Sequence, residues 1–224
     1  MPAHRKELNI KGPNLWYLVG LITSDGCLSK DGRHIDITSS DYEFLSKIKN
    51  KFSLTNRIGI KNKEKINLAY YIQISNKNFY DFLLSIGLIP NKSLTLDRLD
   101  ISKEFFNDFL RGLIDGDGSL RSWRHTTNLH IQWSLSVFSA SEAFIKWLQA
   151  AIEASLCCRG KIHSALRPDR INPIYTLKYG KMAARKIAEK CYYKNCFGLE
   201  RKIKLAQECS RSYSGWDRSK TVFN

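Results

Sequence analysis

The sequence lacks any apolar run that approaches the about 20 residues needed for a membrane-spanning helix. Its first eleven residues are polar and basic, without the apolar core of a secretion signal. No CxxC pair or zinc-like His spacing accompanies the six cysteines, Cys27, Cys157, Cys158, Cys191, Cys196 and Cys209. We therefore expect an intracellular protein that is neither secreted nor bound to a membrane, in a bacterial or archaeal cytoplasm or an organelle, with reduced and mostly buried thiols.

Acidic residues are also in the minority. The chain of 224 residues has 36 Lys and Arg against 21 Asp and Glu, which gives a formal charge of +15. The excess is +5 in residues 1–100 and +10 in the remainder, so both halves are basic. Such a distribution favours a long polyanion as the partner of both halves, although a basic and merely solvated surface has the same sign of charge.

What the chain does contain is one nonapeptide used twice. Residues 18–26 read LVGLITSDG and residues 110–118 read LRGLIDGDG, so that equivalent positions are 92 residues apart. This offset predicts two units of about 100 residues each. We place them at residues 1–98 and 99–224, with a connector that runs to about residue 100.

The register of each copy is helical. Leu18, Leu21 and Ile22 recur at the i, i+3, i+4 spacing of a buried face, as do their counterparts in the second copy. Small residues form a second row, Gly20 with Ser24 in the first copy and two glycines in the second. Glycine inside a helix costs roughly 0.5–1 kcal/mol relative to alanine. The repeat therefore predicts two helices packed almost backbone to backbone.

Such packing would bring Asp25 and Asp117, which precede the last glycine of each copy, side by side. Two adjacent carboxylates repel, and each would lie near the negative end of its own helix dipole. Bound divalent cations would offset both effects, and hard oxygen ligands suit Mg²⁺. The backbone carbonyls of Ser24 and Gly116 could bind the same ions.

Alternating polar and apolar residues after each motif predict strands, and 3.6-residue periodicity between them predicts helices. The resulting fold is α+β, with two pseudo-symmetric αββαββα units, each an antiparallel sheet saddle backed by helices and joined through the paired motif helices. Polar side chains would face outward, where Arg, Lys and Gln reach phosphates and base edges, although an ordinary solvated sheet face is the alternative. The candidate DNA-binding residues are Ser29, Asp31, Arg33, His34, Asp36, Thr38, Ser39, Arg57, Lys61, Lys63, Tyr71, Gln73, Arg121, Trp123, His125, His130, Gln132, Ser134, Ser136, Ser139, Lys161, His163, Arg167 and Arg170.

The two nonapeptides resemble the paired signature of LAGLIDADG homing endonucleases in their single-chain form. The second copy is close to the family consensus, whereas the first has Thr23 where an acidic residue is usual. The resemblance implies that Asp25 and Asp117 are the metal-binding acids. It also implies a catalytic lysine from each half, for which Lys92 and Lys202 are the best matches, although either could instead bind a backbone phosphate. Ser39 and Ser139 occupy the place of a water-ordering residue.

These observations predict a monomeric, metal-dependent endonuclease that cuts both strands of a long, roughly pseudo-palindromic DNA target and needs no protein partner. Mg²⁺ is the expected cofactor; Mn²⁺ or Ca²⁺ could replace it, Ca²⁺ without efficient cleavage. Two alternatives remain open, a maturase that binds intron RNA and a catalytically silent DNA-binding protein on the same scaffold.

Overall fold

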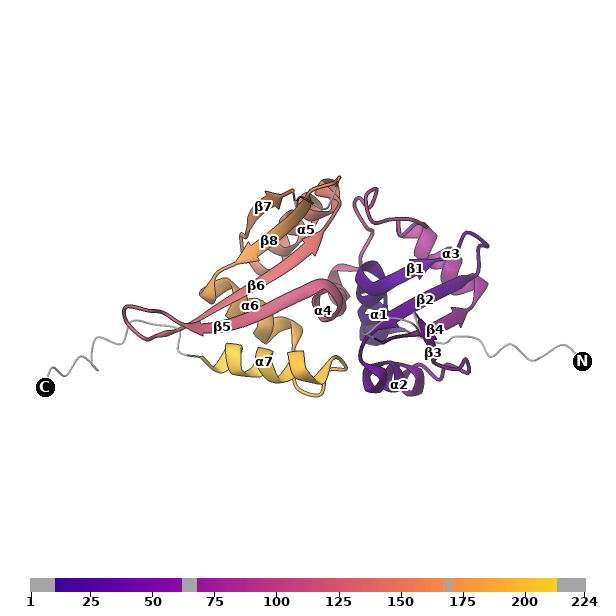
Figure 1. The fold of residues 1–224 in the computed structure, drawn as a ribbon, viewed down its shortest axis with the longest axis horizontal. Helices are drawn as coiled ribbons and strands as arrows, with labels where there is room; N and C mark the ends of the chain where they lie inside the picture. Colours follow the sequence, from indigo (N-terminus) through magenta and orange to yellow (C-terminus); the bar gives the residue numbers. More distant parts are fainter. Residues whose placement is uncertain (1–10, 62–67, 167, 169–170, 213–224) are drawn as a thin grey trace, which may run out of the picture.

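The computed structural model describes residues 11–61, 68–166, 168 and 171–212, which form two similar units (Figure 1). The first unit contains α1 (Gly12–Asp25), β1 (Gly26–Leu28), β2 (His34–Ser39), α2 (Tyr42–Lys51), β3 (Gly59–Lys61), β4 (Ala69–Ser75) and α3 (Lys77–Ser85). The second contains η1 (Lys103–Phe105), α4 (Phe106–Asp117), β5 (Gly118–Arg124), β6 (Ile131–Ser139), α5 (Glu142–Leu156), β7 (Lys161–Ala165), β8 (Ile174–Tyr179), α6 (Lys181–Cys191) and α7 (Glu200–Arg211). The predicted α+β class with two αββαββα units is confirmed, and the second unit ends with one additional helix.

Each unit has one antiparallel sheet of four strands, in the order β1-β2-β4-β3 or β5-β6-β8-β7. The register is the same in both sheets. Gly26, the first residue after α1, lies opposite Ile37, and Gly118, the first residue after α4, lies opposite Val137. The repeat seen in the motifs therefore extends through the sheets.

The motif helices α1 and α4 lie side by side between the two units (Figure 1). A Cβ atom on Gly20 would be 2.0 Å from the carbonyl oxygen of Phe109, and one on Gly112 would be 2.0 Å from the carbonyl oxygen of Tyr17. Both distances are far inside van der Waals contact. The predicted close approach of the two helices through their glycines is confirmed.

Alternation along the strands separates a core face from an outward face. Ile35 and Ile37 of β2 are fully buried, whereas Asp36 and Thr38 between them are partly exposed. The apolar face of α2, which includes Leu45, packs within the same core. One face of each sheet thus packs in the hydrophobic core, and the other face carries the polar side chains. Within the described ranges, no helix is both long and apolar enough to cross a membrane.

Local capping explains where several helices begin. The side chains of Asp41, Asn76 and Ser141 accept hydrogen bonds from the backbone N–H three residues later and cap α2, α3 and α5. Ser102 precedes the short helix η1 and makes no such bond, and α4 begins at Phe106. The expectation of mostly buried thiols is wrong for Cys27, on the outward face of β1, and for Cys157, at the end of α5.

Candidate functional site

Asp25 and Asp117 are the last residues of α1 and α4, and each is followed directly by a strand. The next residue, Gly26 or Gly118, turns the chain from helix to strand. A Cβ atom on either glycine would lie 2.6 Å from the Cα atom four residues earlier, so the junction requires glycine. Each motif therefore presents one carboxylate at the negative end of its helix dipole.

The two carboxylates lie close together because the motif helices meet at their last turn. A Cβ atom on Gly116 would lie 1.9 Å from Ser24 Oγ and 3.0 Å from Asp25 Oδ2, so glycine at this position leaves room for the acid of the first motif. Asp25 is half-buried and Asp117 is exposed. Burial and, after it, the negative charge of Asp117 together raise the pKa of Asp25 to about 6. Partial removal from water also raises the pKa of Asp117.

The two predicted lysines lie beside these acids, and both are buried. The ammonium group of Lys92 donates to the carbonyl oxygen of Gly26, and that of Lys202 donates to carbonyl oxygens at the end of α4, at 2.8 Å for Asp115 and 2.9 Å for Gly118. Burial lowers the pKa of both lysines, to about 8 for Lys202. Their positive charges in turn oppose the rise in the pKa of both site acids. Each lysine thus stabilises the C-terminal end of a motif.

The pair of acids fits a divalent cation. Neither Asp25 nor Asp117 accepts a hydrogen bond or joins an ion pair within the described residues. In that same part of the chain, no group of three or more His, Cys, Asp or Glu side chains is placed to hold a metal ion. Backbone carbonyls, water and phosphate oxygens would therefore complete the coordination. Of the two predicted backbone ligands, Ser24 and Gly116, the second already accepts a hydrogen bond from Lys202 at 3.4 Å.

Asp115, two residues before the second site acid, forms a buried anchor that the sequence analysis did not identify. Its carboxylate accepts hydrogen bonds from the hydroxyl groups of Tyr17 and Tyr192, both at 2.8 Å, and from the backbone N–H of Leu199 at 2.7 Å. Leu199 is the residue before α7, which carries Lys202. Asp115 therefore connects α4, α1 and the start of the lysine-bearing helix. The acidic residue in the second motif, absent from the first, was the available signal.

The outward face of the first sheet carries most of the residues predicted there. His34, Asp36 and Thr38 of β2 and Tyr71 and Gln73 of β4 are all partly exposed. Lys61 at the end of β3 is exposed and donates to Thr38 at 3.5 Å, and Arg57 is exposed before the same strand. Lys63 lies outside the described residues. The structure brings this part of the predicted set together on one surface.

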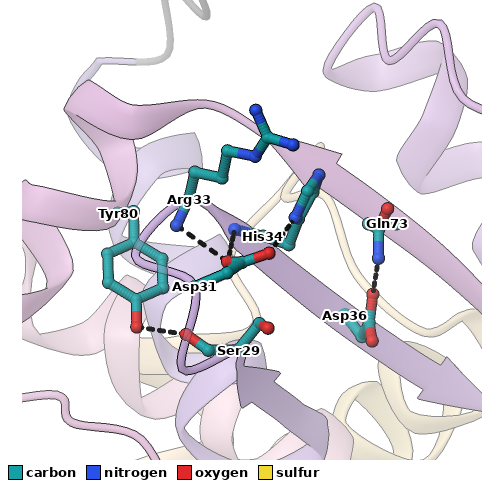
Figure 2. A network of polar contacts seen from close by, with 7 residues as sticks. All are labelled: Ser29, Asp31, Arg33, His34, Asp36, Gln73 and Tyr80. Carbon is teal, nitrogen blue, oxygen red and sulfur yellow. Dashed lines mark hydrogen bonds and ion pairs between the residues drawn. The ribbon is translucent and has the colours of Figure 1, made fainter.

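Three predicted residues, Ser29, Asp31 and Arg33, lie in the turn between β1, which ends at Leu28, and β2. Figure 2 shows the polar contacts that hold this turn. The carboxylate of Asp31 contacts His34 Nδ1 and accepts the backbone N–H groups of Arg33 and His34, each at 3.1 Å. The bond from His34 lowers the pKa of Asp31 to about 2. Asp31 is therefore engaged in orienting the turn and the imidazole ring.

The second sheet extends into a long hairpin of β5 and β6, which projects beyond the helices (Figure 1). Arg121 and Trp123 lie on its outward face, opposite Ser134 and Gln132. No Asp or Glu occurs in residues 118–141. His125 and His130 are exposed near the turn, and Lys161 and His163 are exposed on β7. Ser136 is partly exposed. Arg167 and Arg170 lie outside the described residues.

Two parts of the prediction need correction. Ser134 lies on the outward side of β6 but is only 8% exposed, so little of it is available to a ligand. Ser39 and Ser139 each accept the backbone N–H two residues later at 3.1 Å, so their hydroxyl oxygens already serve the following helices. Lys178, exposed on β8 between buried Leu177 and Tyr179, was not among the predicted DNA-binding residues. The alternation of polar and apolar residues in this strand could have identified it.

Comparison with known proteins now gives the family. Residues 12–87 match the model of the LAGLIDADG-like domain. The fold is similar to that of I-DmoI in complex with DNA and Ca, at 16% identity and a TM-score of 0.54, covering 86% of this chain and 96% of that one. Residues 12–87 thus form a LAGLIDADG-like domain. The meganuclease I-SmaMI bound to uncleaveable DNA has the same fold, at 14% identity and a TM-score of 0.57, with 88% and 89% covered.

Other proteins that are similar to this chain have different names. Full-length DUF199/WhiA from Thermatoga maritima matches 96% of this chain and 67% of its own, at 17% identity and a TM-score of 0.55. In sequence, the chain is 31% identical over 172 residues to the ATP-dependent DNA helicase Hel308 of Thermococcus kodakarensis and 28% identical over 178 residues to the uncharacterized protein MJ1054 of Methanocaldococcus jannaschii. Each match covers 72% of this chain but only 15% and 20% of the relative, so the chain spans a fifth or less of their lengths.

Proposed function

We propose that this LAGLIDADG protein is a divalent-metal-dependent, site-specific DNA endonuclease of the homing type, which acts as a monomer on both strands of its target. The observation that carries the proposal is the pair of adjacent acids, Asp25 and Asp117, at the ends of the paired motif helices, where two sheets with polar outward faces begin. Neighbours of the same fold, I-DmoI and I-SmaMI, are described as bound to DNA, the first with Ca. The two halves, residues 1–98 and 99–224, would each bind one half-site.

The chemistry follows from what each group can do. Asp25 and Asp117 would hold the cations as ionised carboxylates, one for each strand. A bound Mg²⁺ would lower the pKa of the attacking water and neutralise charge on the leaving oxygen. Lys92 and Lys202 would keep both acids ionised and add positive charge near the scissile phosphates. The outward faces of the sheets would bind phosphates and base edges, so that the duplex cannot shift along the site.

The experiment replaces each acid by its neutral isostere. Asp25→Asn and Asp117→Asn should abolish double-strand cleavage while leaving duplex affinity largely intact, since the amide keeps the shape but cannot hold the cation as a carboxylate does. Asp81→Asn, which changes an exposed acid on α3, is the matched control and should cut normally. The substrate is found first by selecting cleaved sites from a randomised duplex library with Mg²⁺.

The outcomes separate this proposal from its alternatives. Loss of duplex binding by both variants, with the fold preserved, would contradict the assigned roles. Intact target-bearing DNA with Mg²⁺ present would favour a catalytically silent DNA-binding protein. Splicing of a host intron RNA without any DNA cleavage would favour a maturase.

A further inference from the structure

The outward faces of the two sheets carry opposite chemistry at equivalent positions. Because both sheets have the same register, Asp36 of β2 and Ser136 of β6 occupy the same place, one residue before the position opposite the first glycine of each sheet. Across the next strand pair, Asp36 lies opposite Gln73, and Ser136 lies opposite Lys178. We call Asp36 with Gln73 the first row, and Ser136 with Lys178 the second row.

The first row is acceptor-rich. Gln73 Nε2 donates to Asp36 Oδ1 at 3.0 Å (Figure 2). A carboxylate can only accept hydrogen bonds, so Asp36 fixes the amide with its NH₂ group toward the acid and its oxygen turned away. The free groups of this row are then a carboxylate oxygen and an amide oxygen, with one remaining amide hydrogen.

The second row is donor-rich and positively charged. Lys178 is exposed, and the residue on its other side is Lys161 of β7. Like charges directly opposite each other destabilise a sheet. Neither lysine forms an ion pair in the described part of the chain. Ser136 adds a hydroxyl group, and the surrounding hairpin, residues 118–141, contains no acid.

We propose that the two rows select opposite base edges at equivalent positions of the two half-sites. This inference rests on the proposed DNA-binding function. The first row takes a base with an exocyclic amino group in the major groove, cytosine N4 or adenine N6. It rejects guanine, whose O6 and N7 are both acceptors. The second row takes guanine through Lys178, because its ammonium group donates to those same two atoms.

The test exchanges the rows. In an Asp25→Asn, Asp117→Asn background, which should bind without cutting, duplexes retained from a randomised library are sequenced. Asp36→Ser with Gln73→Lys gives the first half the chemistry of the second, and Ser136→Asp with Lys178→Gln does the reverse. Asp36→Asn, which no longer fixes the amide, and Lys178→Arg, which keeps a guanine-binding donor, are the conservative controls. The exchanged side chains are partly or fully exposed, and thermal unfolding checks that each variant folds.

The parent protein should retain an amino-bearing base at one position and guanine at its counterpart, each by about tenfold over the alternatives. Each exchange should convert the preference in one half-site and leave the other unchanged. Asp36→Asn should relax the first preference, and Lys178→Arg should keep the second. Binding with the same base at both positions, or exchanges without effect, would overturn this inference alone. Failure to retain any duplex would overturn the proposed function as well.

Discussion

The two motif helices have their glycines and apolar residues at the same positions, but several other positions differ in polarity between the two helices. Asp108, Arg111 and Asp115 are buried in α4, whereas the positions 92 residues earlier in α1 are Trp16, Val19 and Thr23. The guanidinium group of Arg111 forms an ion pair with Asp108 at 2.8 Å. It also donates to the carbonyl oxygens of residues 191 and 197, both at 2.9 Å. Buried polar bonds from α4 thus hold the end of α6 and the segment before α7, whereas Trp16 and Val19 of α1 have no charged side chain to do the same.

The same difference between the halves explains why the first motif has Thr23 where the second motif has Asp115. Asp115 is bonded across the interface by Tyr17 of α1. The residue equivalent to Tyr17 in α4 is Phe109, which has no hydroxyl group to offer Thr23. Thr23 instead donates to the carbonyl oxygen of Val19 at 2.8 Å within its own helix. The glycines and the terminal acids are present in both motif helices because both halves need them. The anchor of α7, formed by Asp115, has no counterpart at Thr23.

The largest loss of stability should come from Arg111→Met, which affects only the second half. It leaves the buried carboxylate of Asp108 without its cation, and losing one partner of a buried pair costs about 3–5 kcal/mol. Urea unfolding of the variant and parent measures this difference. Val19→Met, at the equivalent position of α1, is the matched control for introducing the same side chain in an apolar environment. An Arg111→Met variant as stable as the parent would contradict a structural role for the network.

Alanine at the motif glycines should affect both halves equally. Gly20→Ala and Gly112→Ala each direct a methyl group against a backbone carbonyl 2.0 Å away, and overpacking of this kind costs about 3 kcal/mol. Gly32→Ala, at a glycine with no neighbour within 4 Å of the added carbon, controls for the methyl group, though its positive φ adds strain of its own. Strongly unequal losses at Gly20 and Gly112, measured by urea unfolding, would show that the interface is less symmetric than described.

Removing the hydroxyl group of Tyr17 should test the difference between the two halves at their interface. Tyr17→Phe deletes a donor to the buried carboxylate of Asp115, and a hydrogen bond to a charged group is worth about 1.5–3 kcal/mol. Phe109→Tyr, the reverse change on the other side of the interface, should give no gain because Thr23 supplies no carboxylate. Chemical unfolding of both variants measures the effect. A stabilised Phe109→Tyr protein would show that the first half also accommodates this bond.

The smallest expected effect is on pH dependence. The folded pKa of Asp25 is raised to about 6 from an ordinary value of 3.8, so the folded state binds this proton more tightly than the unfolded state. Without metal, this group therefore lowers stability as the pH rises from about 4 to about 6, and a bound cation should restore it. Thermal unfolding with EDTA or Mg²⁺ at pH 5 and pH 7 measures this. Asp25→Asn should reduce the pH dependence, and a Mg²⁺ effect equal at both pH values would contradict this assignment.

Much of this arrangement was readable from local patterns. The glycine rows of the motifs predicted the helix contact, and strand alternation predicted the outward placement of His34, Asp36 and Gln73, because both follow from short-range periodicity. Short-range patterns did not predict contacts between residues that are distant in sequence. Ser134 lies on the outward face as predicted but is buried in the folded chain. The anchoring role of Asp115 depends on Tyr17 and Leu199, which are 98 and 84 residues away.

Two glycine-lined helices that end in acids 92 residues apart could be predicted from the chain alone, since repeated spacing and helical periodicity are visible in the order of its residues. The pKa values of those acids depend on the tertiary structure. The burial that raises the pKa of Asp25, the lysines held by helix-end carbonyls and the Asp36–Gln73 pair all depend on which segments meet in space. Such effects arise from desolvation and from charges a few ångströms away, and neither is encoded in the neighbours of a residue along the chain.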